Sequence, residues 1–245
     1  MKLINLPNII TCCNILCGCM AVLCGLQGDV AYASLFIIAG AVFDFFDGMT
    51  ARALHISGPI GKELDSLADM VSFGIAPSIL AYQLTRSIYG PEVNYIDYFL
   101  AMIMAAFSAL RLAKFNCDER QSLSFIGLPT PANALFWIGM TFVVRLPGVN
   151  ETLTGLNPEL FGALWFILVV VMSVLLISEL PMFSLKLKPG HNGFAENRAR
   201  YIFLGLTALI LAATALAGLT WLAAAPAFII LLYIIISVAD FVLGR

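Results

Sequence analysis

Four aspartates lie inside long apolar stretches of the sequence, where a carboxylate is costly. Asp44 and Asp47 are spaced i,i+3 in one stretch, and Asp65 and Asp69 are spaced i,i+4 in the next. Such spacings place each pair on one face of a helix. An ionised carboxylate in the hydrocarbon core of a bilayer costs at least ~2.5–3.5 kcal/mol, so four of them indicate shared cations or water. An all-oxygen donor set favours magnesium, manganese or calcium over zinc or copper.

Small residues and an arginine accompany these carboxylates. Gly48 and Ala51 follow the first pair, and Gly61 precedes the second. Small side chains let helix backbones approach one another or a bulky ligand closely. Arg52 lies eight residues after Asp44, and this helical spacing turns it toward the same side. Because a guanidinium beside a metal–carboxylate site suits a phosphate, the pattern predicts phosphate chemistry.

The two pairs are expected at similar depth on facing helices. Asp47 lies nine residues before Ile56, and Asp65 lies nine residues after it. Nine helical residues correspond to roughly 13 Å. A turn around Ile56 would therefore bring the inner members of both pairs together near one boundary of the membrane.

The elements that must position these residues are long apolar helices. Of the 245 residues, 61% are hydrophobic and only 11% are charged, whereas a soluble domain has roughly 25% charged residues. A bilayer core of ~30 Å needs about 20 helical residues per crossing. Apolar runs between Gly- and Pro-containing connectors predict eight spans, at residues 7–26, 31–54, 61–84, 96–115, 131–147, 159–180, 200–218 and 221–242. The fifth run is short and the last two nearly touch, so seven spans also fit.

The charges predict how the chain lies in the membrane. Of the 13 Lys and Arg residues, all except Arg86 and Arg145 fall on the side of the N-terminus when eight spans are drawn. Because basic residues accumulate on the cytoplasmic side, we expect both termini there. We expect a single integral membrane domain over residues 1–245, in a prokaryotic cell membrane. The net charge of −2 argues against a nucleic-acid partner.

The acidic stretch resembles a known signature. It consists of Asp44-Phe-Phe-Asp47-Gly48-Met-Thr-Ala51-Arg52, eight further residues, and Gly61-Lys-Glu-Leu-Asp65-Ser-Leu-Ala-Asp69. The CDP-alcohol phosphotransferase family carries Asp-x-x-Asp-Gly-x-x-Ala-Arg, a spacer of eight, and Gly-x-x-x-Asp-x-x-x-Asp, and all eight fixed positions are present here. The resemblance implies an all-α, polytopic transmembrane bundle with a six-helix core. It also implies a homodimer and an active site that opens to the cytoplasm.

The resemblance also implies roles for individual residues. The four aspartates would bind a divalent metal, Mn²⁺ or Mg²⁺, with Ca²⁺ able to occupy the site, and Asp69 would serve as the general base. The opening helix would border the nucleotide. The CDP-lipid would be bound by Asn8, Thr11, Gly48, Ala51, Arg52 and Gly61.

Three further segments resemble the phosphatidylserine synthase branch of that family. They are Ser72-Phe-Gly-Ile-Ala-Pro77, Arg111-Leu-Ala-Lys114-Phe-Asn116 and Gly127-Leu-Pro-Thr-Pro-Ala-Asn133-Ala134. The resemblance implies transfer of a phosphatidyl group from CDP-diacylglycerol to L-serine, with release of CMP. Arg111 and Lys114 could hold the serine carboxylate, or they could be interfacial anchors. Asn116 could contact serine or cap a helix.

Two other functions remain open at this point. The same chemistry could act on glycerol phosphate, inositol phosphate, inositol or choline, although a phosphorylated acceptor would call for a larger basic pocket. A cation transporter would also place acids inside a membrane. A transporter would spread them along a route, whereas these four are expected at one depth beside an arginine.

Overall fold

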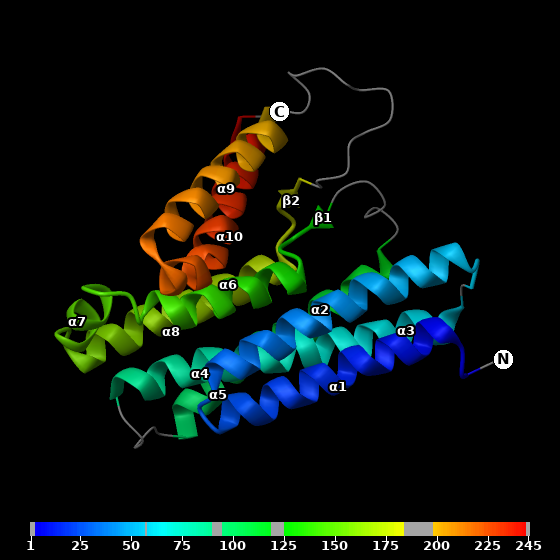
Figure 1. Ribbon diagram of the computed structural model, residues 1–245, viewed down its shortest axis with the longest axis horizontal. Helices are drawn as coiled ribbons and strands as arrows, with labels where there is room; N and C mark the ends of the chain where they lie inside the picture. Colours follow the sequence, from blue (N-terminus) through cyan, green and yellow to red (C-terminus); the bar gives the residue numbers. More distant parts are fainter. Residues whose placement is uncertain (1–2, 57, 90–94, 119–124, 184–197, 244–245) are drawn as a thin grey trace.

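A computed structural model describes residues 3–56, 58–89, 95–118, 125–183 and 198–243, which are almost entirely helical (Figure 1). Its helices are α1 (Leu6–Leu26), α2 (Val30–Ala53), α3 (Pro59–Asp69), a π-helical segment (Met70–Ile75), α4 (Ala76–Tyr89), α5 (Tyr95–Cys117), α6 (Thr130–Val143), α7 (Val149–Thr154), α8 (Pro158–Ile177), α9 (Arg198–Ala217) and α10 (Leu219–Val242). Two short strands, β1 (Phe125–Ile126) and β2 (Pro181–Met182), form an antiparallel pair.

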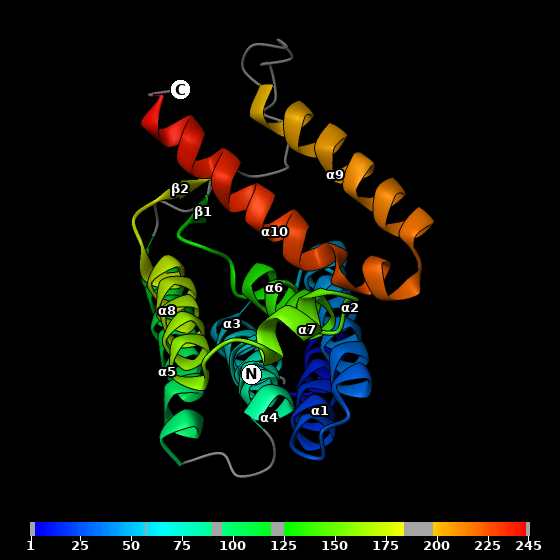
Figure 2. The ribbon, with the colours of Figure 1, turned by 90° about the vertical axis from the view of Figure 1, so that its left-hand side faces the viewer.

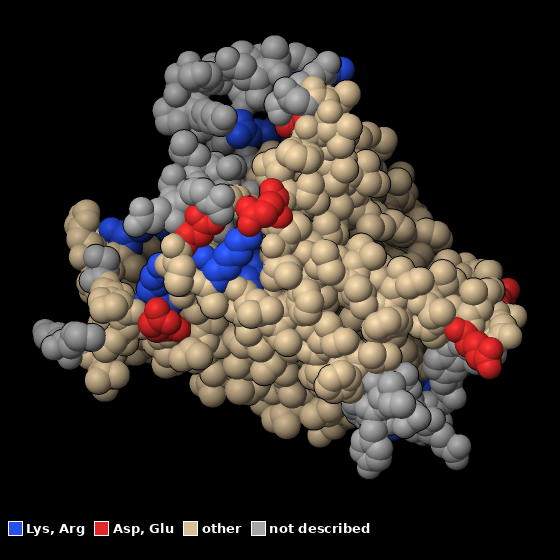
Figure 3. All heavy atoms as spheres, turned by 180° about the vertical axis from the view of Figure 1, so that it is seen from behind, with Lys and Arg blue, Asp and Glu red and all other residues tan. Residues whose placement is uncertain are grey.

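Within the described part of the chain, seven helices are long and apolar enough to cross a membrane. They are α1, α2, the continuous helix Pro59–Ser87, Phe99–Cys117 in α5, Glu159–Ile177 in α8, α9 and α10. Seven such spans indicate an integral membrane protein and confirm the predicted all-α, polytopic bundle. The surface agrees, because Figure 3 shows a largely uncharged face on which most charged side chains gather toward one end.

Among the described helices, the one at the predicted span 131–147 is shorter than a full crossing. This helix, α6, has 14 residues and is therefore only about 21 Å long, less than the ~30 Å of a bilayer core. Pro131 lies in its first turn, and the chain turns after Val143, where Leu146 N donates to Val143 O (3.0 Å). Most of its side chains are buried by the protein. The sequence run was apolar because α6 lies inside the bundle.

A tight contact fixes the helices that carry the aspartates. Ser72, in the π-helical segment that follows Asp69, donates a hydrogen bond to Asn14 O of α1 (3.0 Å). A Cβ atom at Gly40 of α2 would lie 2.9 Å from Asn14 Oδ1 and 3.3 Å from Ser72 Oγ. Glycine is needed at this point because the three segments meet there. The contact holds α1, α2 and the end of α3 in one arrangement.

The second half of the chain packs on this unit through α6. A Cβ atom at Gly139 of α6 would lie 2.7 Å from the Cβ of Ala227 in α10, so these helices are in backbone contact. Figure 2 shows α9 lying on α10, away from α1 to α5. The larger hydrophobic core contains the fully buried side chains of Leu128, Phe136, Trp137, Met172 and Leu176.

The β1–β2 pair joins the two connections at one end of the bundle. Phe125 pairs with Met182, and Ile126 pairs with Pro181. Gly127 then adopts a φ of +77°, where an L side chain is strained, and its Cβ would lie 2.6 Å from Leu176 O. This turn places the start of α6 beside the end of α8.

Candidate functional site

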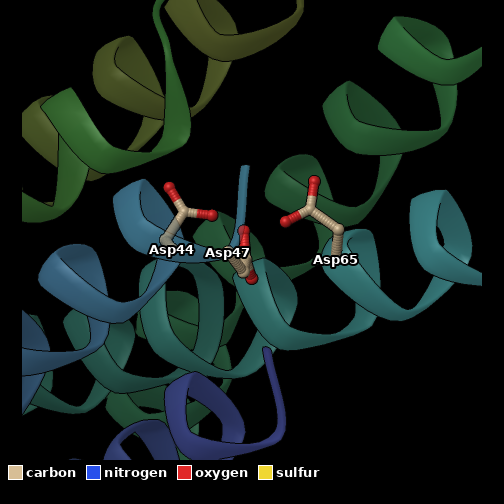
Figure 4. A group of neighbouring side chains, drawn as sticks. All are labelled: Asp44, Asp47 and Asp65. Carbon is tan, nitrogen blue, oxygen red and sulfur yellow. The ribbon is translucent and has the colours of Figure 1, made fainter. Parts of the chain in front are cut away.

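Three of the four aspartates converge between α2 and α3. One carboxylate oxygen from each of Asp44, Asp47 and Asp65 lies within 4.8 Å of the other two. Figure 4 shows the three carboxylates facing a common space, with Asp44 and Asp47 on α2 and Asp65 on α3. The helical hairpin thus brings the inner members of both pairs together, as their equal distances from the turn predicted.

Asp69 lies one helical turn farther along, as the last residue of α3. Its charge interacts with those of Asp44, Asp65 and Arg111, so it borders the cluster on the side of α5. Its Oδ1 atom is buried and has no hydrogen-bond partner among the described residues, and the same is true of Asp47 Oδ2. Buried carboxylate oxygens without partners are costly. They require a cation or water that the protein itself does not supply.

A hard divalent cation fits this donor set. The candidate ligands are carboxylate oxygens only, from three side chains that can share one ion. Magnesium, manganese and calcium prefer such oxygens, whereas zinc and copper prefer nitrogen or sulfur. The acidic cluster is therefore a candidate metal centre.

A cavity of about 420 Å³ opens beside the metal centre. Asp47 and Asp65 are part of its wall, so the cavity and the metal centre are continuous. The candidate CDP-lipid residues that also line it are Asn8, Thr11, Gly48, Ala51 and Gly61.

The two glycines leave the wall of the cavity open. A Cβ at Gly61 would lie 3.5 Å from Asn8 Oδ1, and a Cβ at Gly48 would lie 3.4 Å from Arg52 Nη1. The Arg52 side chain therefore folds back over Gly48, at the edge of the cavity. A larger side chain at either glycine would occupy the space that a ligand needs.

The opening helix presents Asn8 and Thr11 through a well-defined N-terminus. Asn5 caps α1 by accepting a hydrogen bond from Asn8 N (2.9 Å), and Pro7 lies in the first turn. At this position the missing N–H of proline costs nothing. Asn8 Nδ2 in turn donates to Leu3 O (2.9 Å). Asn8 therefore has a structural bond and also lines the cavity.

Several residues of the cavity wall were missed by the sequence analysis. They are Asn5, Pro7, Ile56, Gly58, Pro59, Ile60 and Lys62. Five of them lie in the α2–α3 connection or the first turn of α3, where the Gly-Pro pair indicates a turn and gives no sign of a ligand. Their position follows from the hairpin, which folds this connection over the start of α1.

Arg111 lies deep in the site. Only 6% of its surface is exposed, and its Nη1 donates to Thr130 Oγ1 at the start of α6 (3.3 Å). Its guanidinium carbon lies 5.3 Å from the centre of the Phe115 ring, and its charge interacts with that of Asp69. An interfacial anchor would extend its charged end to water. The burial of Arg111 therefore favours a role within the site.

The other two candidate serine ligands make contacts between helices. Lys114 Nζ forms an ion pair with Glu179 Oε1 (2.5 Å) and donates to Ile177 O (3.3 Å), which joins α5 to the end of α8. Asn116 Nδ2 donates to Ser66 Oγ of α3 (2.8 Å), and Asn116 O accepts from Lys62 Nζ (2.6 Å). Of the three candidates, Arg111 is the one whose charge interacts with that of Asp69, and serine binding stays a prediction for all three.

Comparison with known proteins shows which family the chain belongs to. Residues 4–177 match the family model described as CDP-alcohol phosphatidyltransferase. The chain belongs to this family. The matching region contains the four aspartates, the cavity residues and Arg111, and it ends before α9 and α10. The converging carboxylates therefore lie inside the region that matches the family.

The names of individual relatives in this comparison all refer to serine. A CDP-diacylglycerol–serine O-phosphatidyltransferase of Bacillus subtilis is 39% identical over 137 residues, 56% of this chain and 75% of that protein. One of Helicobacter pylori is 31% identical over 176 residues, 71% of this chain and 70% of that protein. An archaetidylserine synthase of Methanothermobacter thermautotrophicus is 32% identical over 180 residues, 72% of this chain and 69% of that protein. The first two names include serine as a substrate, and the third names a serine-containing lipid as the product.

Proposed function

We propose that the protein transfers the phosphatidyl group of CDP-diacylglycerol to L-serine and releases phosphatidylserine and CMP. The observation that carries this proposal is the cluster of Asp44, Asp47 and Asp65 in the wall of a cavity, with Asp69 and Arg111 beside it. The relatives named for serine transfer supply the acceptor. Family membership sets aside the cation-transporter alternative.

The carboxylates hold the metal in this proposal. Asp44, Asp47 and Asp65, with Asp69 at the border, would bind Mn²⁺ or Mg²⁺, and Ca²⁺ can occupy the same oxygen ligands. A metal held by these residues would supply positive charge to neutralise the diphosphate and the departing CMP. The cavity residues Asn8, Thr11, Gly48, Ala51 and Gly61 bind the CDP part of the lipid, and Arg52 contacts a phosphate from the edge.

Asp69 is the general base. It accepts the proton of the serine hydroxyl as that oxygen attacks the lipid-bearing phosphorus, and the bond from this phosphorus to the CMP oxygen breaks. Arg111, next to Asp69, binds the serine carboxylate and so places the hydroxyl near the base. Lys114 and Asn116 border this subsite through their bonds to α8 and α3.

The expected location of the active site follows from the two kinds of substrate. The lipid donor stays in the bilayer, whereas serine and CMP are soluble in water. We therefore place the active site and both termini on the cytoplasmic side of a prokaryotic cell membrane, where phospholipid is made from the cytoplasmic pools. We also propose that the protein works as a homodimer.

Release of CMP tests this function. Purified protein in detergent is given CDP-diacylglycerol, Mn²⁺ or Mg²⁺, and one alcohol at a time. We expect CMP only with L-serine, loss of release with EDTA, and recovery when metal is added in excess. Release with glycerol 3-phosphate or inositol instead would keep the metal chemistry and refute the acceptor. No release with any alcohol would refute the transferase function.

Filling the cavity should weaken binding of the lipid donor. In Gly61→Val the new methyl groups would enter the cavity next to Asn8 Oδ1. We expect the KM for CDP-diacylglycerol to rise about tenfold, since overpacking typically costs about 1–3 kcal/mol, while the KM for serine changes much less. Gly205→Val is the matched control, because a Cβ at this α9 position meets nothing within 4 Å. Equal effects of both substitutions would place Gly61 outside the lipid site.

Removing the buried guanidinium should weaken binding of serine. In Arg111→Ala, we expect the KM for serine to rise about 10- to 100-fold, because an ionic hydrogen bond contributes about 1.5–3 kcal/mol. The KM for CDP-diacylglycerol should change less than threefold. The two constants are measured from CMP release at saturating levels of the other substrate. An unchanged KM for serine would show that Arg111 has a structural role and does not bind serine.

A further inference from the structure

A lysine in the wall of the cavity keeps its charge available for a ligand. Lys62 lies in the first turn of α3 and lines the cavity together with Asp65. Among the described residues Lys62 forms no ion pair, although Asp65 is only one helical turn away. The signature Gly-x-x-x-Asp leaves the position of Lys62 open, so the sequence gives this residue no role.

Hydrogen bonds between α3 and α5 hold the ammonium of Lys62 in place. Lys62 Nζ donates to Asn116 O, in the last turn of α5 (2.6 Å). Asn116 Nδ2 donates to Ser66 Oγ (2.8 Å), which in turn donates to Lys62 O (3.2 Å). An ammonium has three N–H donors, and Asn116 O accepts from one of them. The other donors can bind an anion in the cavity.

Lys62, Asp65 and Asp69 follow one another along α3. Their spacings of three and four residues place them on one face of the helix, about 4.5 and 6 Å apart along its axis. Asp65 is one of the three converging acids (Figure 4). Lys62 and Asp65 line the cavity, whereas Asp69 is not part of its wall. The lysine and the proposed base therefore lie on opposite sides of Asp65.

An in-line displacement needs this order of groups. In phosphoryl transfer, the attacking and the leaving oxygens lie on opposite sides of the phosphorus. With Asp69 as the base, the serine hydroxyl approaches from one side, and the CMP oxygen departs on the side of Lys62. The N-terminus of α3, from Pro59 onward, belongs to the cavity wall on that side. The free N–H groups at a helix N-terminus also favour an anion.

The charges of the site call for a cation at this position. Asp44, Asp47 and Asp65 carry three negative charges, against the two positive charges of one divalent ion, and the diphosphate of a CDP-lipid adds two more negative charges. CMP departs with a further negative charge on its phosphate. A lysine in the first turn of a helix is unfavourable for the helix itself, because the dipole is already positive there. An anionic ligand accounts for Lys62 better than helix stability does.

We propose that Lys62 is a catalytic residue that binds the phosphate of the departing CMP. This inference rests on the proposed function, since it requires a CDP-lipid as the donor. The serine oxygen forms a bond to the lipid-bearing phosphorus, and the serine proton passes to Asp69. The bond from this phosphorus to the bridging oxygen breaks, and its electron pair stays on that oxygen, next to the Lys62 ammonium. Arg52 comes from α2, so each helix of the hairpin supplies one cation to the diphosphate.

The test is Lys62→Met in the full chain, which removes the charge and keeps most of the length of the side chain. Binding of CMP and of cytidine is measured by calorimetry in detergent with Mn²⁺ and without any alcohol. We expect the Kd of CMP to rise about tenfold, the size of one lost ionic hydrogen bond. The Kd of cytidine, which has no phosphate, should stay within twofold. Lys62→Arg keeps the charge and should recover most of the CMP binding.

Kinetics of the same variant separate the leaving group from the acceptor. In Lys62→Met, we expect the kcat of CMP release to fall about tenfold, because the charge on the departing phosphate loses a partner. The KM for serine should stay within twofold. An unchanged Kd for CMP, or equal weakening of CMP and cytidine, would overturn the inference. A rise in the KM for serine that matches the loss of CMP binding would also overturn it, since Lys62 would then act through α5.

Two matched controls address packing and charge. Ser66→Ala removes the hydroxyl that accepts from Asn116 and keeps the Lys62 ammonium. Arg145→Gln removes an exposed cation after α6 that is not part of the cavity wall. CMP binding should stay within twofold of the unmodified protein in both. Loss of CMP binding in Ser66→Ala to the level of Lys62→Met would mean that Lys62 only joins α3 to α5, and the inference would fail.

Failure of the proposed function is seen separately, in the unmodified protein. CMP release with an alcohol other than serine would change the acceptor and keep CMP as the leaving group. The losses expected in Lys62→Met would then still support the inference. No CMP release with any alcohol would refute the transferase function and the inference with it.

Discussion

Replacing Asp69 by asparagine should nearly abolish turnover while leaving CDP-diacylglycerol binding largely intact. Asparagine has the same shape but cannot accept the proton of the attacking hydroxyl. Asp69 borders the cluster and lies beside Arg111, whereas Asp44, Asp47 and Asp65 supply the three oxygens that converge. Loss of general base catalysis lowers a rate by about 10²- to 10⁴-fold. We therefore expect kcat to fall by at least about 100-fold.

The measurement combines kinetics with binding. The kcat is taken from CMP release at saturating serine and Mn²⁺, and donor binding is taken from the rise in melting temperature when CDP-diacylglycerol is added. Glu63→Gln is the matched control, because Glu63 is an exposed acid of the same helix and its loss should leave both readouts unchanged. A variant that loses turnover and donor binding to the same extent would show that Asp69 serves the metal or the fold and is not the base.

The acidic centre was predictable because it depends on local periodicity. Spacings of three and four residues put each pair of acids on one helix face, and Asp47 and Asp65 lie at equal distances from the turn. A short hairpin then leaves little freedom in how the two faces meet. The family resemblance, and not periodicity, assigned Gly48 and Gly61 to the CDP-lipid site, and both residues line the cavity.

Contacts between distant segments were not predictable in this way. Asn116 bonds to Ser66 across 50 residues, and Lys114 pairs with Glu179 across 65. The sequence carries no periodic signal for such partners.

The apolar run of α6 shows a different limit. Hydropathy measures transfer out of water, and burial inside a protein satisfies it as well as lipid does. The apolar run at 131–147 therefore predicts a span, and α6, the helix found there, has 14 residues that are largely buried by the protein. A helix with many fully buried side chains, such as Phe136 and Trp137, differs from a lipid-facing helix only in its neighbours.

Replacing Asp47 by alanine should stabilise the metal-free protein and remove its response to metal. Asp47 is 5% exposed, and its Oδ2 has no hydrogen-bond partner among the described residues. Without metal, three carboxylates within 4.8 Å repel one another. Deleting one of them relieves that repulsion and also removes a buried polar group without a partner. The same change takes away one of the ligands that the metal would need.

The two effects have opposite signs and are read in one experiment. The melting temperature in detergent is measured with EDTA and with Mn²⁺ in excess. A ligand at 100 times its Kd stabilises a fold by about 2.7 kcal/mol, so Mn²⁺ should raise the melting temperature of the unmodified protein by about 5–10 °C, at about 2–4 °C per kcal/mol. In Asp47→Ala, we expect a higher value than the unmodified protein in EDTA and almost no rise with Mn²⁺. Activity should fall by at least about 100-fold.

Asp240→Asn provides the matched control for Asp47→Ala. Asp240 lies in the last turn of α10 and is not one of the converging acids. Its variant should keep the full response to Mn²⁺. A normal rise with Mn²⁺ in Asp47→Ala would mean that the metal, if one binds, is held elsewhere. A lower melting temperature in EDTA would mean that Asp47 supports the fold through a favourable contact. Because Asp69 lies at the border of the metal centre, Asp69→Asn should retain most of the Mn²⁺ response that Asp47→Ala should lose, and the pair separates the base from the three converging ligands.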